Sequence, residues 1–530
     1  MVSFQARSDN GLSRTRYAIS NVLLRARRRK SVVAALLSAC LAMIGAVIPS
    51  AQALPARTIE PLIPGDEPIV VTSHKIDTPR GPLAYEARVG RLPIRNEQTG
   101  EVRGHIFFVA YHATARQRKR PITFLWNGGP TVASWIIHTL GAGPRLRRGG
   151  DFVDNPETLL AESDLVFMDP IETGFSRPAK PEFAPEFFQF QGDVATTTEF
   201  IRAYRSRFRA GDQPLFIAGQ SYGVFRGAAV VEELGRRGVK VAGAILISGD
   251  IPNIPQPTEF YNAMHIPART ATAFHHKRLP PELMRDREAT MAEALGWART
   301  TYQPALARID QLTASEREAV ALSLARYTGI SPKLVNRKTL VIPIKTYLAQ
   351  FFGGDLSRAL NGEDTRLSDG VDDVLGTEAQ LDAYMRDELQ YVTDLSYRGI
   401  ERGYMPTPGP AAKTSRQQFH YNQPGMTDEA WSNVLATGEV TEVARLNPPW
   451  IVNALKRDKS LRVLVATGRF DPLNMCEGNV IVTATLPSDL SSRITNRCYE
   501  AGHIVYHDEK ARLAFSHDLA SFVRTAAAGN

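Results

Sequence analysis

The sequence is poor in cysteine, with three among 530 residues, at positions 40, 476 and 498. It also lacks the spacings by which many proteins bind zinc, since neither H-E-x-x-H nor paired C-x-x-C occurs. These absences exclude a dense disulfide framework and the common zinc sites. We therefore expect no metal and no cofactor.

Excess charge is also missing from most of the chain. The net charge is +8 for the whole sequence and +7 for residues 1–53, which leaves only +1 for the rest. The basic character therefore belongs to the N-terminal segment, and the sequence gives no support to a nucleic-acid partner.

That N-terminal segment predicts a signal peptide, residues 1–53. The basic cluster at 25–30 precedes an apolar stretch at 32–48, and Ala51-Gln52-Ala53 fits a small-x-small cleavage site. Cleavage after Ala53 would give an exported protein, periplasmic or secreted. Two alternatives remain: a membrane lipoprotein with Cys40 lipidated in the box Leu37–Cys40, or an uncleaved membrane anchor. The true start site could also lie downstream, because the region before the apolar stretch is long.

After cleavage the chain keeps only Cys476 and Cys498. An even pair in an oxidising compartment predicts a disulfide, and two buried free thiols are the alternative.

Short apolar strands alternate with helical segments through much of the sequence. This pattern predicts an α/β protein with a mostly parallel sheet covered by helices on both faces. The expected strands are residues 69–72, 83–89, 106–110, 121–125, 165–169, 214–218, 242–247, 461–466 and 493–499. We expect the core in two parts, 54–250 and 456–530. The mainly helical interval 251–455, with helices at 281–301, 315–328 and 377–395, is expected to be a cap insertion.

The pentapeptide Gly219-Gln220-Ser221-Tyr222-Gly223 lies between an expected strand and an expected helix at 224–234. Strand, G-x-S-x-G and helix form the context of a nucleophile elbow, in which the glycines allow close packing around a sharp turn. Ser221 is therefore the candidate nucleophile. The strand at 121–125 leads into Asn127-Gly128-Gly129-Pro130, whose backbone amides are typical of an oxyanion hole. A simple Gly-Pro turn is the alternative there.

Asp471 and His503 each follow an expected strand, so with Ser221 they occur in the order used by α/β-hydrolases. A serine hydroxyl needs an imidazole to take its proton, and the imidazole needs a carboxylate to fix its tautomer. Asp250 is another acid at a strand end, and other histidines lie near His503. These alternatives are His507 and His517.

Several segments together resemble the serine carboxypeptidase family of α/β-hydrolases, and an exported bacterial-type member in particular. They are Trp126–Pro130, Met168–Ser176, Ile217–Gly223, Asp471–Asn479 and Ala501–His503, within residues 104–515. The resemblance implies the triad above, an oxyanion hole from the N–H groups of Gly129 and Tyr222, and an Asn127 side chain that helps hold the terminal carboxylate of a peptide.

Two positions depart from the family pattern: Gln220 and Gly141 stand where the family has glutamates. In the family these acids, when protonated, bind the peptide carboxylate. A glutamine amide can donate the same bond at any pH. We therefore expect Gln220 to bind substrate in a serine-type carboxypeptidase that depends less on acid.

The expected reaction is hydrolysis of C-terminal residues from a peptide substrate through an acyl-enzyme. An esterase or acyltransferase of the same fold is the first alternative. A non-catalytic exported binding protein is the second. The sequence leaves the oligomeric state open.

Overall fold

The computed structural model describes residues 57–59, 66–114, 120–251, 256–355, 358–368, 376–399, 419–420 and 449–529. The predicted signal peptide, including Cys40, lies outside these residues. All the described residues belong to the second of two units, Pro55–Asn530. Within them, no helix combines the length and the apolar character that crossing a membrane requires.

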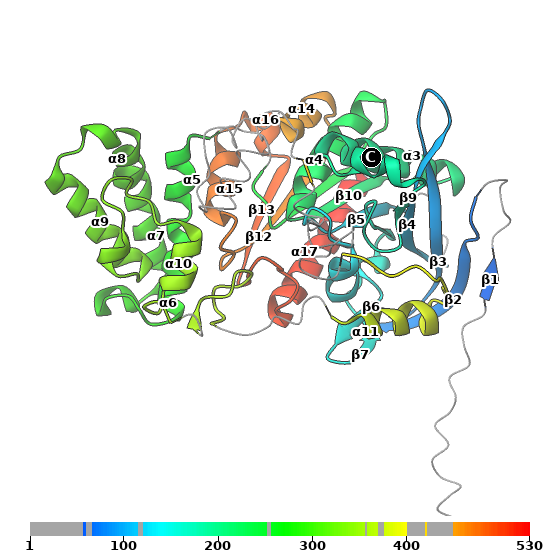
Figure 1. Cartoon of the computed structure of the whole chain (residues 1–530), viewed down its shortest axis with the longest axis horizontal. Helices are drawn as coiled ribbons and strands as arrows, with labels where there is room; N and C mark the ends of the chain where they lie inside the picture. The colour runs from blue at the N-terminus through cyan, green and yellow to red at the C-terminus, as the bar shows by residue number, and fades with distance from the viewer. Residues whose placement is uncertain are drawn as a thin grey trace, which may run out of the picture. The chain divides into compact units, whose positions relative to one another are not determined.

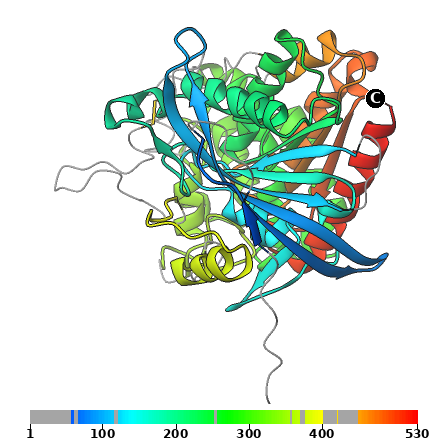
Figure 2. The ribbon, with the colours of Figure 1, turned by 90° about the vertical axis from the view of Figure 1, so that its right-hand side faces the viewer.

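One mixed sheet runs through this unit (Figures 1 and 2). In spatial order its strands are β1 (Arg57–Ile59), β2 (Val70–Thr78), β3 (Gly81–Arg95), β4 (Val102–Ala113), β8 (Asp164–Met168), β5 (Ile122–Trp126), β10 (Leu215–Gln220), β11 (Gly243–Ile247), β12 (Arg462–Gly468) and β13 (Ile494–Tyr499). The strands from β8 to β13 are parallel, and β1 to β4 are antiparallel. The short β9 (Arg177–Pro178) pairs with β4. The predicted mostly parallel sheet is confirmed.

Burial explains why the central strands are mostly apolar. Every residue of β5, β8, β10 and β11 is buried. Strands covered on both faces have no solvent side on which to place polar residues. Most of β3 instead alternates between more and less buried positions, as a strand with one open face does.

Helices cover both faces of the sheet. One face packs against α3 (Phe190–Arg207), α4 (Tyr222–Arg236) and α14 (Trp450–Arg457). The other packs against α17 (Glu509–Ala528) and the π-helix η1 (Ile137–Ala142). The sheet thus lies between two apolar cores, and its carboxyl edge is left for loops.

A further group of helices shares a core of its own and lies at one end of the sheet (Figure 1). Its main members are α5 (Thr258–Met264), α6 (Ile266–His275), α7 (Arg287–Trp297), α8 (Gln303–Ala307), α9 (Ala314–Thr328) and α10 (Ile344–Gln350). Met475 and Val482, from the region of α15 (Cys476–Ala484), join this core. The expected helix 281–301 is interrupted before α7, because the Asp286 side chain caps that helix by accepting from the Ala289 N–H.

The predicted helix 377–395 is wrong beyond residue 388. It consists of α11 (Glu378–Ala383) and the π-helix η9 (Tyr384–Glu388). Gln390 has φ of +54°, a left-handed conformation that no helix can continue. Leu381 and Tyr384 belong to the core on the α17 face of the sheet rather than to the core of the separate helical group.

Cys476 and Cys498 form a disulfide, with their Cα atoms 5.7 Å apart. The predicted pairing is confirmed. It ties the first residue of α15 to β13, so it links the segment that follows Asp471 to the strand that precedes His503.

Removing this disulfide should destabilise the protein. The double variant Cys476→Ser/Cys498→Ser frees a loop of 22 residues in the unfolded chain, which in the chain-entropy model lowers the free energy of unfolding by about 3 kcal/mol. Urea unfolding of the variant and of wild type measures the difference. Reductant should destabilise only wild type, and equal stability of the two proteins would contradict the prediction.

Candidate active site

Ser221 sits on a sharp turn between β10 and α4. Its φ of +60° and ψ of −129° are strained for a residue with a side chain. The turn is held because the Ser221 N–H donates to the carbonyl of Ile247 at 2.9 Å. A Cβ on Gly219 would lie 1.9 Å from the Gly223 carbonyl oxygen. The glycines of the pentapeptide are therefore required sterically, as the sequence indicated.

His503 and Asp471 meet beside the carboxyl ends of β12 and β13. His503 Nδ1 lies 2.9 Å from Asp471 Oδ2, and Asp471 is fully buried. The other carboxylate oxygen accepts from the Leu473 N–H at 2.8 Å, and Asn474 Nδ2 donates to Oδ2 at 2.8 Å. Burial by itself would raise the pKa of Asp471. The His503 charge and these hydrogen bonds outweigh it and lower the pKa, so the carboxylate is ionised at neutral pH.

The other acid and the other histidines are less suitable as partners of Ser221. Burial and the neighbouring Asp471 raise the pKa of Asp250 to about 7, so Asp250 is partly protonated at neutral pH. His507 is exposed, and the His517 side chain is 79% exposed beside Asp518. The geometry favours the pair Asp471 and His503.

The turn after β5 packs directly against the elbow. A Cβ on Gly128 would lie 2.5 Å from the Tyr222 backbone nitrogen and 2.9 Å from Ser221 Cβ. Gly129 has φ of +107° and precedes a cis-Pro130. The amides of this turn thus lie beside the first residue of α4, an arrangement that suits two backbone donors converging on one oxyanion. Gly129 and Tyr222 remain the predicted donors.

Asn127 and Gln220 form a buried amide pair whose orientation is fixed. The Ile137 N–H, which can only donate, bonds Asn127 Oδ1 at 3.0 Å. Asn127 Nδ2 therefore faces Gln220 and donates to Gln220 Oε1 at 2.6 Å. Gln220 Nε2 is then turned toward the carbonyl of His503, 3.4 Å away. The two predicted substrate-binding amides are thus brought together, one residue from Ser221.

Tyr506 is a member of this network that the sequence did not reveal. Asn127 Nδ2 donates to the Tyr506 hydroxyl at 3.3 Å. A Cβ on Gly141 would lie 3.1 Å from Tyr506 Cγ, so the ring packs closely against the residue that stands in place of a family glutamate. No sequence pattern around Tyr506 indicated this, because the contact joins residues far apart in the chain.

The loops carrying His503 and Asp471 are held by a segment from the predicted cap interval. The His503 N–H donates to the Glu363 carbonyl at 2.6 Å, and the Thr365 N–H donates to the Phe470 carbonyl at 3.1 Å. A Cβ on Gly502 would lie 2.3 Å from the Glu363 oxygen. Sequence reasoning missed this support too, since the segment carries no motif.

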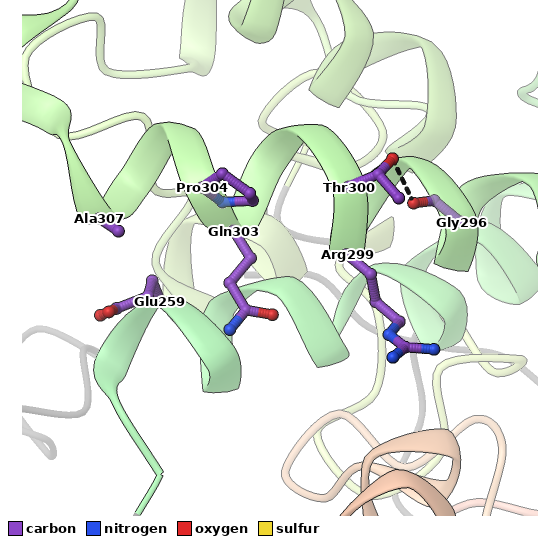
Figure 3. A pocket seen from close by; sticks show the side chains of 7 residues that line it. All are labelled: Glu259, Gly296, Arg299, Thr300, Gln303, Pro304 and Ala307. Carbon is purple, nitrogen blue, oxygen red and sulfur yellow. Dashed lines mark hydrogen bonds between the residues drawn. The ribbon is translucent and has the colours of Figure 1, made fainter.

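Away from the predicted triad, an open hollow of about 490 Å³ lies among α5, α8 and the π-helix η5 (Ala298–Tyr302) (Figure 3). Glu259, Arg299, Thr300 and Gln303 supply its polar side chains, and none of the predicted catalytic residues lines it. Across the part of the chain that the structure describes, no cluster of His, Cys, Asp or Glu side chains is arranged to hold a metal ion.

Residues 86–235, which include the Asn-Gly-Gly turn and the Ser221 elbow, match the family model described as serine carboxypeptidase. This matched segment is similar to the serine carboxypeptidase family. The match supports the predicted serine hydrolase, and the sheet covered by helices on both faces confirms the predicted α/β-hydrolase fold. No curated protein sequence matches this chain.

Three solved structures illustrate what this chain is similar to. Kex1(delta)P, a prohormone-processing carboxypeptidase from Saccharomyces cerevisiae, is 14% identical, with 83% of this chain and 91% of that chain covered and a TM-score of 0.49. A proline iminopeptidase from Mycobacterium smegmatis is 12% identical, with 83% and 99% covered and a TM-score of 0.37. A thermostable carboxyl esterase from Bacillus coagulans is 11% identical, with 83% and 99% covered and a TM-score of 0.38.

Substituting Gly502 should displace the candidate base. In Gly502→Ala the new methyl group meets the Glu363 carbonyl and pushes the His503 loop away, and a displacement of about 1 Å can lower kcat about 100-fold. Hydrolysis of an activated ester measures this. Gly150→Ala is the matched control, because nothing lies within 4 Å of its added Cβ. Equal kcat for the two variants would contradict the prediction.

Proposed function

We propose that this protein is a serine carboxypeptidase that releases C-terminal residues from peptides through an acyl-enzyme on Ser221. His503 Nε2 takes the proton of Ser221 Oγ as the oxygen attacks the scissile carbonyl carbon. The N–H groups of Gly129 and Tyr222 stabilise the resulting oxyanion. His503 then gives the proton to the leaving amine, the C–N bond breaks, and the C-terminal residue departs. Water, deprotonated by His503, hydrolyses the acyl-enzyme and regenerates Ser221.

The observation that carries this proposal is the 2.9 Å contact between His503 Nδ1 and Asp471 Oδ2 at the edge where β10 presents Ser221. The ionised, buried Asp471 accepts a hydrogen bond from Nδ1–H of His503, which fixes the tautomer and leaves Nε2 as the basic nitrogen.

Two amides are proposed to recognise the terminal carboxylate of the peptide. Asn127 and Gln220 lie between the turn after β5 and the elbow, and their orientations are fixed by the bond from Ile137. Neither side chain titrates, so this recognition does not depend on a protonated acid.

A second candidate is an esterase of the same mechanism. The packing of Tyr506 against Gly141 favours it, because a tyrosine ring stands where the family has a carboxyl group that binds peptide termini. Both candidates use the same Ser221, His503 and Asp471.

Export to the periplasm or medium is proposed from the N-terminal segment, with lipidation of Cys40 as the alternative. The disulfide between Cys476 and Cys498 supports an oxidising compartment.

The central test is release of C-terminal amino acids from a defined peptide mixture, followed by mass spectrometry. We expect release by the mature protein and none by Ser221→Ala, because that variant lacks the nucleophile. Amidated peptides are the substrate control, since they carry no terminal carboxylate. Ser221-dependent hydrolysis of short esters without any peptide release would overturn the carboxypeptidase assignment and favour the esterase.

The variant Gln220→Glu should shift activity toward acidic pH. One carboxyl oxygen would replace Nε2 and face the His503 carbonyl, where only a protonated oxygen can donate. Activity of the variant should therefore fall as pH rises above the pKa of the new acid, while wild type keeps its activity.

The pH profiles of kcat/KM from pH 4 to pH 8 measure this shift. The exposed Gln98→Glu adds the same charge away from the amide pair and should leave the profile unchanged. Superimposable profiles for Gln220→Glu and wild type would show that Gln220 does not set the pH dependence.

A further inference from the structure

A buried ion pair lies directly beneath the candidate site. Arg226, five residues after Ser221 on α4, donates through Nε to both oxygens of Asp193, at 3.0 and 2.8 Å. Asp193 is in the first turn of α3, which lies beside α4 (Figure 1). The two side chains are only 1% and 6% exposed. Both charges are thus taken out of water immediately behind the elbow.

The same pair contacts both sides of the predicted oxyanion hole. Arg226 Nη1 donates to the main-chain carbonyl of Asn127 at 3.0 Å. The Tyr222 hydroxyl donates to Asp193 Oδ2 at 3.0 Å, and the guanidinium lies 5.2 Å from the centre of the Tyr222 ring. The turn at Asn127, the start of α3 and the start of α4 are distant in the sequence, and hydrogen bonds to Arg226 and Asp193 therefore hold them together.

Stability alone does not account for such a pair. Replacing a buried ion pair by apolar side chains of similar volume is often neutral or stabilising. The bonds to Asn127 and Tyr222 give the charges a second role. Because the peptide unit is planar, holding the Asn127 carbonyl also sets the plane from which Gly128 and Gly129 continue. Glycines restrict that turn least of all residues, so its orientation has to be imposed from outside.

We propose that the Arg226–Asp193 pair positions the oxyanion hole of this enzyme. It acts through two groups, the Asn127 carbonyl on one side and the Tyr222 side chain on the other, and it keeps the two N–H donors aimed at one point. Arg226 and Asp193 are positioning residues and do not contact substrate. The inference rests on the proposed function only in requiring a Ser221 acyl-transfer site, whatever the acyl group.

The decisive variant is Arg226→Met/Asp193→Leu, which replaces both charges by apolar groups. We expect its melting temperature to return close to that of wild type, whereas Arg226→Met alone should be destabilised by an unpaired buried Asp193. Losing one oxyanion donor lowers kcat by about 10²–10³. Misaligning the donors should accordingly lower kcat of the double variant at least about tenfold on an activated ester, with KM changed less than about threefold.

The matched control is a second buried pair, Arg120 with Asp164, at the amino ends of β5 and β8. Arg120→Met should lose stability as Arg226→Met does but keep its kcat, because that edge of the sheet is opposite the site. A double variant with wild-type stability and wild-type kcat would overturn the inference.

If the double variant does not fold, the variant Tyr222→Phe provides the test, since it removes only the hydroxyl bond to Asp193. A several-fold lower kcat at unchanged melting temperature supports the proposal, and an unchanged kcat overturns it.

The activated ester and a fluorophosphonate probe separate this inference from the carboxypeptidase assignment, because neither has a peptide terminus. An enzyme that hydrolyses the ester but no peptide overturns the assignment and leaves the positioning role testable as described. A correctly folded wild-type protein that reacts with neither reagent overturns both.

Discussion

The site depends on the contact between two neighbouring strand ends, β5 and β10, which pair in parallel with Trp126 opposite Gly219. Their turns approach so closely that a Cβ at Gly128 would meet the Tyr222 nitrogen at 2.5 Å. Trp126 Nε1 donates to the Gly223 carbonyl at 3.0 Å and bonds the strand to the helix. Glycine makes this approach possible, and the approach brings the candidate nucleophile Ser221 next to the amides that are predicted to stabilise the developing charge.

Burial and hydrogen bonds together decide which acidic groups near this contact are ionised. Asp471 stays ionised because His503 and its polar neighbours outweigh the cost of burial, whereas Asp250, with fewer such partners, has a pKa raised to about 7. Two acids on neighbouring strand ends thus differ in protonation, and only Asp471 bonds the histidine. Asn127 and Gln220 beside them are neutral. The two residues that are proposed to bind a substrate carboxylate therefore add no acidic group to the site.

Short apolar runs in the sequence predicted most strands of the core, because strands buried on both faces are rich in apolar residues. The predicted strands are found in the sheet. It was less successful between residues 251 and 455. The predicted helix at 377–395 ends at Glu388, because Gln390 takes a left-handed conformation. Leu381 and Tyr384 pack on the sheet rather than among the separate helices. Helical periodicity shows that a face is buried but not against which partner it packs.

By itself the sequence determined the elbow, the glycine turn and the order of Ser221, Asp471 and His503, because each has a local signature of a strand followed by a defined turn. Tertiary structure alone decided which groups support them. Tyr506 beneath Asn127 and Glu363 behind His503 come from distant parts of the chain and carry no motif. Such contacts arise from the packing of whole helices, strands and loops, so the local sequence does not predict them.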